Sequence, residues 1–268
     1  IRVAVLFGGV SSEHEISLMS VQSVLRNMPE DYEVLTIGIT KDGRWVEYTG
    51  SIDEITDQKW EQDQNLRTAV VSPDRSHKGI LLIDKDQVTV VPVDICFPVL
   101  HGKHGEDGTI QGLFQLAGIP FVGCNMISSA NCMDKEMTHT ILEANGIKMA
   151  KWVIVNGEKM NDFENFAKDA EEKLGYPMFV KPANAGSSVG VGKAHNREEL
   201  KSACKTALKE DYKAVVEECI EMQEVETAVL GNGDPKAAGV VGELVPVVEF
   251  YTYEAKYIDG TTVLHIPG

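Results

Sequence analysis

The chain has 268 residues, of which 43% are hydrophobic and 25% are charged, so it can bury a sizeable core and is neither disordered nor collagen-like. Its 25 basic and 41 acidic residues give a formal net charge of −16, which repels phosphate backbones, so we expect no nucleic acid partner. No apolar run approaches the roughly 18 residues that span a bilayer, and no signal-peptide pattern is visible, so we expect a soluble protein without a membrane partner. The five cysteines form no CxxC pair, which argues against a disulfide framework or thiolate zinc site and favours the cytoplasm.

The first third of the chain alternates strand and helix patterns. An apolar run over residues 2–7 ends in two glycines, and a capping-box sequence from Ser12 to Glu15 precedes a helical apolar pattern that continues to Met28. Residues 33–39 predict the next strand. Such a strand–helix–strand unit is parallel and places the glycine turn at the carboxyl edge of a sheet, where open α/β proteins bind ligands.

The remaining elements follow in order. Residues 51–78 are polar and predict loops and short helices without recognisable chemistry, whereas 80–83 and 88–93 predict a hairpin. A buried strand over 95–100 leads to His101 and the loop HGKHGEDG. We then expect a helix over 109–116, a strand over 120–123 and a helix over 128–144. The rest of the chain predicts an α+β unit, with strands at 152–155, 177–180, 214–219 and 227–230 and helices at 162–174 and 197–209.

The most informative segment runs from residue 179 to 192 and reads FVKPANAGSSVGVG. Glycines and two serines after a strand can present backbone N–H groups and hydroxyls to a phosphate. The segment is not a Walker A loop, because its glycine spacing differs and Lys193 is followed by Ala194. A flexible surface hairpin is the alternative, and Lys181 just upstream favours the phosphate loop.

Several charged residues outside that loop could also bind a ligand. Lys135 and Lys181 could flank nucleotide phosphates, although each alone could be a solvated surface lysine. Glu217 lies in an acidic strand, where alternation places Cys219 on the same face. An acid in this setting could bind an adenine amino group or a ribose hydroxyl, and the alternative is an ordinary half-exposed strand. His101 with His104, Glu106 and Asp107 favours a substrate-positioning loop over a zinc site.

Six blocks of sequence together resemble one known family. They are FGGVSSEHEISL (7–18), VLHGKHGEDGTIQGLFQLAGIPFVG (99–123), MDKEMTH (133–139), FVKPANAGSSVGVGK (179–193), EVETAVLGN (224–232) and FYTYEAKY (250–257). They are similar to the D-alanine:D-alanine ligases of the ATP-grasp superfamily and to the related D-alanine:D-serine ligases. The resemblance implies an α/β and α+β fold: an N-terminal open parallel α/β domain that binds D-amino acid (1–125), a central ATP-grasp domain (126–212) and the start of a C-terminal ATP-grasp domain (213–268).

The resemblance also implies a reaction. ATP phosphorylates the carboxylate of one D-alanine, and the amine of a second D-amino acid attacks the acyl phosphate, which yields a dipeptide for peptidoglycan. ATP and Mg²⁺, with Mn²⁺ as a possible substitute, are the implied cofactors, and a homodimer is the implied assembly. The EAKY block favours an amine acceptor but does not separate D-alanine from D-serine.

Site residues are carried over by their position in the matching blocks. Glu13, Ser187 and Tyr257 match the catalytic group that surrounds the substrate, and Glu13 and His101 match the residues that bind the first D-alanine. The residues that match the ATP site are Lys135, Lys181, Ser187, Ser188, Val189, Glu217, Cys219, Ile220, Glu224 and Lys256.

The family's oxyanion arginine and its Asp, Glu and Asn magnesium ligands follow the EAKY block, and we expect them beyond Gly268, so no metal ligand is assigned. Two explanations remain open: the sequence is a piece of a longer ligase, which we expect, or it is a naturally shortened, non-catalytic module that binds D-alanine and nucleotide. A different ATP-grasp carboxylate–amine ligase is disfavoured by the His101 loop together with EAKY.

Overall fold

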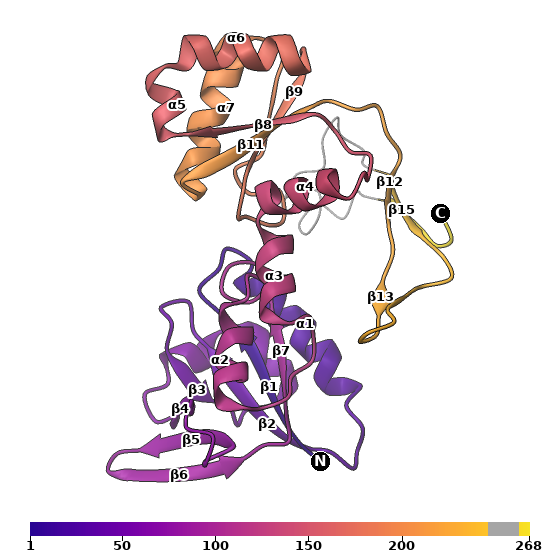
Figure 1. Cartoon of the computed structure of the whole chain (residues 1–268). Coiled ribbons are helices and arrows are strands. Elements are labelled where there is room, and N and C mark those ends of the chain that lie inside the picture. Colours follow the sequence, from indigo (N-terminus) through magenta and orange to yellow (C-terminus); the bar gives the residue numbers. More distant parts are fainter. Residues whose placement is uncertain (246–262) are drawn as a thin grey trace. The chain divides into compact units, whose positions relative to one another are not determined.

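The computed structural model describes residues 1–245 and 263–268, and these form two compact units, Ile1–Thr138 and His139–Gly268 (Figure 1). The domain boundaries expected after residues 125 and 212 remain predictions. Among the described residues, no helix is long and apolar enough to cross a membrane.

The first unit is built on a seven-stranded sheet with the order β6-β5-β4-β3-β2-β1-β7. Its strands are β1 (Arg2–Gly8), β2 (Glu33–Ile39), β3 (Trp45–Glu47), β4 (Thr68–Val71), β5 (Gly79–Asp84), β6 (Gln87–Pro92) and β7 (Ile95–Leu100). β1 pairs in parallel with β2 and β7, which confirms the predicted strand–helix–strand unit, and the remaining pairs are antiparallel. Residues 51–78 hold the expected short helices η1 (Ile52–Asp57) and η2 (Lys59–Gln62), but also β4, which was not expected.

Both faces of β1 are covered. Ala4 and Leu6 pack into a core with helix α2 (Thr109–Ala117), whereas Val3, Val5 and Phe7 pack into a second core with helix α1 (His14–Arg26). Successive side chains of a strand point to opposite faces, so a strand between two helical layers needs a continuous apolar run. This explains the sequence of β1 and places Gly8, its last residue, between the two layers.

The helix predicted after the glycine turn is confirmed, but its predicted capping box is wrong. α1 begins at His14, and Glu13 occupies the cap position without a side-chain capping hydrogen bond, so the capping box from Ser12 to Glu15 does not form. Glu15 instead pairs with Lys41, which follows β2.

Two predictions after α2 also need correction. Residues 120–123 contribute an isolated bridge between Cys96 and Phe121 instead of a strand. The helix expected over 128–144 is two helices, α3 (Met126–Met133) and α4 (Lys135–Ala144). They separate at Asp134, whose ψ of 107° is extended.

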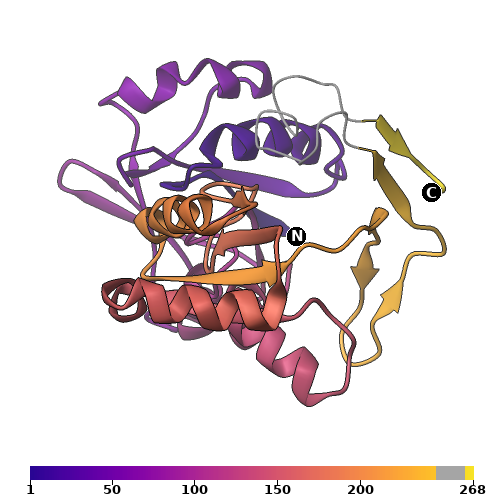
Figure 2. The ribbon, with the colours of Figure 1, turned by 90° about the horizontal axis from the view of Figure 1, so that it is seen from above.

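The second unit has a four-stranded antiparallel sheet with the order β10-β9-β11-β8. Its elements are β8 (Trp152–Asn156), α5 (Gly157–Asn161), α6 (Phe163–Leu174), β9 (Met178–Pro182), β10 (Gly192–Ala194), α7 (Arg197–Glu210) and β11 (Lys213–Glu218). α6 and α7 lie side by side in both views and share one core with this sheet (Figures 1 and 2). Val180 and Val216 belong to that core, so alternation places Lys181 and Glu217 on the opposite face.

Short strands follow β11. β12 (Glu224–Glu226), β15 (Gly242–Val245) and β16 (Val263–His265) form a three-stranded sheet, and β13 (Val229–Leu230) pairs with β14 (Lys236–Ala237). The strand predicted over 227–230 is therefore only the two residues of β13. β11 ends at Glu218, so the alternation expected between Glu217 and Cys219 does not extend to Cys219.

Candidate functional site

The glycine turn after β1 joins three elements of the first unit. Gly8 and Gly9 have φ angles of 88° and 101°, and a Cβ atom on Gly8 would lie 2.1 Å from the carbonyl oxygen of Ile39. Gly9 N donates to that same oxygen at 2.8 Å. Ser17 of α1 accepts from Gly8 N at 2.7 Å and donates to the carbonyl of Val99 in β7. The turn therefore has a backbone path that glycine permits and a side chain would block.

Glu13 lies beside the loop that follows β7. Its backbone N–H donates to Ser11 Oγ at 3.1 Å, and that hydroxyl donates to the carbonyl of His101 at 2.7 Å. A Cβ atom on Gly102 would lie 2.3 Å from Glu13 Oε2, so the carboxylate rests directly on the Gly102 backbone. Glu13 is only 5% exposed. The structure thus brings together two residues predicted to bind the first substrate, and a buried carboxylate of this kind favours a cationic partner.

The HGKHGEDG loop is shaped by its own acids. Glu106 accepts from Gly102 N at 2.7 Å, and Asp107 accepts from His104 N at 2.8 Å and from Thr109 Oγ1 at 2.6 Å. Burial acts to raise the pKa of Asp107, but hydrogen bonds from Thr109 and His104 outweigh it and lower that pKa. His101 Nε2 lies 3.0 Å from Ser20 Oγ of α1. These carboxylates hold the loop backbone in place around His101.

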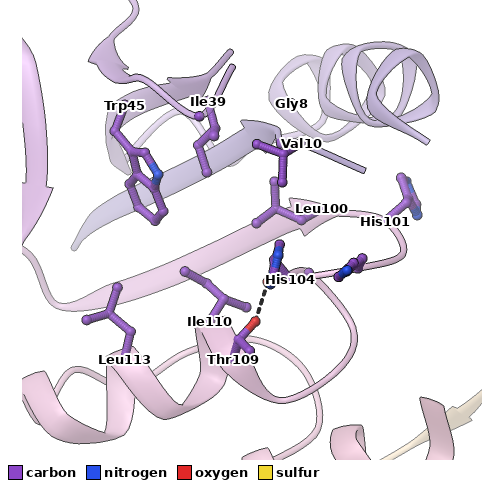
Figure 3. A pocket seen from close by; sticks show the side chains of 14 residues that line it. Gly8, Val10, Ile39, Trp45, Leu100, His101, His104, Thr109, Ile110 and Leu113 are labelled. Atoms are coloured by element: carbon purple, nitrogen blue, oxygen red, sulfur yellow. Dashed lines mark hydrogen bonds between the residues drawn. The ribbon is translucent and has the colours of Figure 1, made fainter. Parts of the chain in front are cut away.

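A cavity of about 370 Å³ opens at the same sheet edge, next to the glycine turn (Figure 3). Val10, Ile39 and Trp45 lie on one side of it, and Ile110 and Leu113 of α2 lie on the other. Its wall is mostly apolar, so it suits an uncharged group. Glu13 is not among its lining residues, so the cavity and the acid are separate features of this edge.

The glycine- and serine-rich loop joins β9 to β10 in the second unit. Ser187 and Ser188 have φ angles of 47° and 62°, a left-handed conformation that is uncommon outside glycine. Val189 N donates to Gly186 O at 3.1 Å, and Val191 N donates to Ser188 O at 3.3 Å. Strained residues of this kind concentrate at ligand sites, and turns with left-handed residues can direct N–H groups at an anion.

Three side chains, one of them from α4, converge on the sheet face opposite the core shared with α6 and α7. Lys181 Nζ lies 2.6 Å from Glu217 Oε2, and His139 Nε2 lies 3.3 Å from Glu217 Oε1. The His139 ring also packs edge-on against Trp152, with centroids 5.3 Å apart. Lys181 and Glu217 were predicted, but His139 was missed. The sequence offered one indication of His139: it lies four residues after Lys135 in the MDKEMTH block and therefore on the same helical face.

The other predicted residues are more dispersed. Cys219 N donates to Pro177 O at 3.2 Å, Ile220 is 47% exposed, and Glu224 begins β12. Lys135 begins α4 and belongs to the first unit with Glu13 and His101. Lys256 and Tyr257 lie outside the described residues. The roles of all these residues remain predictions.

Comparison with known proteins gives consistent matches along the whole chain. Residues 2–124 match the family described as D-ala D-ala ligase N-terminus, and residues 141–268 match D-ala D-ala ligase C-terminus. The D-alanine–D-alanine ligases of Clostridium acetobutylicum and Caldicellulosiruptor bescii are 49% and 47% identical, over 100% of this chain and 74% and 73% of their own lengths.

Solved structures agree with these matches. The Enterococcus faecalis VanG D-Ala:D-Ser ligase has a TM-score of 0.87 and 41% identity, over 100% of this chain and 76% of that chain. The Bacillus anthracis D-alanine–D-alanine ligase complexed with ATP has a TM-score of 0.64 and 26% identity, over 99% of this chain and 70% of that chain.

The fold and the matched regions define an ATP-dependent ligase with an ATP-grasp fold. The α/β and α+β fold class predicted from the sequence is confirmed. More narrowly, the chain belongs to the D-alanine–D-alanine ligase family.

Proposed function

We propose that this protein joins two D-alanine molecules at the expense of ATP and supplies D-alanyl-D-alanine for peptidoglycan. The observation that carries the proposal is the 47–49% identity, over the whole chain, to D-alanine–D-alanine ligases. The γ-phosphoryl group of ATP passes to the carboxylate of the first D-alanine. The amine of the second then attacks this acyl phosphate, and inorganic phosphate leaves.

Glu13 is the proposed holder of the first D-alanine's ammonium group. Its support is the burial of the carboxylate against Gly102, beside the His101 loop, because a buried anion is stabilised by a cation that donates hydrogen bonds. Ser187 and Tyr257 are proposed to hydrogen-bond with this acid, and His101 to lie near the first substrate. Positioning of this kind supplies much of the catalysis in a reaction that joins two bound substrates.

The nucleotide site is proposed on the sheet face of the second unit that carries Lys181 and Glu217. Lys181 and the backbone of Ser187, Ser188 and Val189 would meet the phosphates, with support from the left-handed serines of that loop. Lys135 and Lys256 are further proposed phosphate lysines. The proposed adenosine contacts are Glu217, Cys219, Ile220 and Glu224.

Magnesium is implied by ATP and by the family, with Mn²⁺ as a substitute. Within residues 1–245 and 263–268, no group of three or more His, Cys, Asp or Glu side chains could hold a metal ion. We therefore assign this ion no ligand among the described residues and no step.

The function is tested on the complete protein that carries this sequence. Purified protein with ATP, Mg²⁺ and D-alanine should release ADP in a coupled assay, and mass spectrometry should detect D-alanyl-D-alanine. D-Serine as second substrate is the other candidate, favoured by the similarity to the D-Ala:D-Ser ligase. A product formed only with D-serine would replace the D-alanine proposal, and binding of both ligands without turnover would support a non-catalytic module.

We also propose a homodimer in the cytoplasm, as the family resemblance implies. Light scattering of the purified protein should give twice the mass of one chain. A monomer mass at micromolar concentration would contradict the dimer.

A further inference from the structure

His14 is a buried polar residue with no part in the function proposed above. It is the first residue of α1, directly after Glu13, and its side chain is fully buried. Its Nδ1 lies 2.6 Å from the carbonyl oxygen of Gly9. A carbonyl can only accept, so Nδ1 must carry the hydrogen in this contact.

The other ring nitrogen faces a distant part of the sequence. His14 Nε2 lies 3.3 Å from Oε1 of Glu61, a residue of η2 whose side chain is 10% exposed. The pair lacks hydrogen-bond geometry, and because Nδ1 already carries a hydrogen, the contact is an ion pair that requires a hydrogen on Nε2 as well. The second oxygen of Glu61 accepts from Lys41 N at 2.9 Å, which fixes the carboxylate. The imidazole therefore spans from the glycine turn to the polar segment around η2.

These contacts hold the peptide segment that ends in Glu13. On one side, Ser11 ties it to the His101 carbonyl and to Glu13 N. On the other side, His14 ties it to Gly9 and to Glu61. Because Glu13 lies between these two anchors, movement of either one would shift its carboxylate relative to Gly102.

We propose that His14, held by Glu61, is a positioning residue that fixes the Glu13 carboxylate for the ammonium group of the first D-alanine. This inference rests on the proposed function and extends it to η2, a segment whose sequence suggested no chemistry. It also explains why a polar ring occupies a fully buried position beside the glycine turn.

Two substitutions at His14 separate its two contacts. Asparagine places an amide nitrogen near the position of Nδ1 and keeps the Gly9 contact, whereas glutamine reaches the position of Nε2 and keeps the Glu61 contact. Glu61→Gln keeps an oxygen acceptor for Lys41 N but removes the charge. Asp57→Asn is the matched control, because it also removes one negative charge, from the neighbouring η1. Among the described residues, the salt bridge of Asp57 is with the exposed Lys59.

The test is isothermal titration of the complete protein, with a non-hydrolysable ATP analogue present, using D-alanine and then D-lactate. D-Lactate has a hydroxyl in place of the ammonium group, so it reports general damage to the pocket. We expect His14→Gln to weaken D-alanine binding by about tenfold, and His14→Asn and Glu61→Gln by about threefold, with D-lactate and Asp57→Asn unchanged. Wild-type and Glu13→Gln proteins give the two reference values.

Equal losses for D-alanine and D-lactate, or no loss for D-alanine, would overturn the inference. Thermal melting checks whether the His14 variants fold. If they do not, the comparison of D-alanine with D-lactate binding in Glu61→Gln decides the inference. Failure of the proposed function looks different, because the wild-type protein would then form no dipeptide or Glu13→Gln would bind D-alanine normally.

Discussion

At the scale of single residues, the candidate nucleotide site centres on one carboxylate. Glu217 is nearly buried, and its two oxygens lie 2.6 Å from Lys181 and 3.3 Å from His139. The sequence pattern identified Lys181 and Glu217 separately, but their pairing could not be predicted because strand neighbours far apart in sequence create it. His139 was missed although it lies four residues after Lys135, because that spacing does not show which helical histidines contact a ligand site; the structure shows its contact with Glu217.

Replacing Lys181 tests this site. Lys181→Met should raise the KM for ATP by about tenfold or more, because a charge-assisted contact to phosphate is lost, while kcat for saturating ATP falls less. Initial rates at varied ATP concentration measure both constants. Lys151→Met is the matched control, since Lys151 forms a 3.9 Å surface pair with Glu218 and should change neither constant. An unchanged KM in Lys181→Met would remove this lysine from the proposed phosphate site.

At the scale of elements, sequence patterns located the strands with apolar runs and the amphipathic helices α2, α6 and α7. They failed where tertiary contacts competed with local signals. The Ser12–Glu15 capping box does not form, because Glu13 takes the cap position and Glu15 therefore falls on the second helical residue instead of the third. Residues 120–123 have a strand-like sequence but meet the sheet edge at only one bridge, between Cys96 and Phe121. Local propensity is a weak prior under such competition.

The loop between β9 and β10 allows a matched test of glycine. Gly190 and Gly146 both have a φ angle of 69°, but only at Gly190 would a Cβ atom meet neighbours, Glu210 Cγ at 2.7 Å and Pro182 Cγ at 2.9 Å. Gly146→Ala should therefore cost about 1 kcal/mol of unfolding free energy from the backbone alone, and Gly190→Ala about 1 to 3 kcal/mol more. Urea denaturation measures both values. Equal losses would show that the loop relaxes around the added methyl group.

At the scale of the whole molecule, the chain folds as two units with separate hydrophobic cores. Each unit has a fully buried cysteine in a core, Cys96 in the first unit and Cys204 in the second. Burial raises the pKa of each thiol to about 12. Since the thiolate is the reactive form, each cysteine should be inert while its own unit is folded.

Alkylation can therefore follow the two units separately. Iodoacetamide at pH 8 should modify the exposed Cys124 and Cys132 at once and leave Cys96 and Cys204 unmodified, as peptide mass spectrometry would show. With increasing urea, Cys96 and Cys204 should become reactive at different concentrations if the units unfold independently. Coincident labelling of both at every concentration would instead indicate one cooperative transition.

The left-handed serines of the β9–β10 loop have an evolutionary consequence. Ser187 and Ser188 adopt a backbone conformation that glycine reaches with less strain, so selection for stability alone would drive both positions toward glycine. In a population evolving without demand for the ligase reaction, glycine should accumulate there. Serine that persists under demand for the reaction would mark the hydroxyl itself as the selected feature.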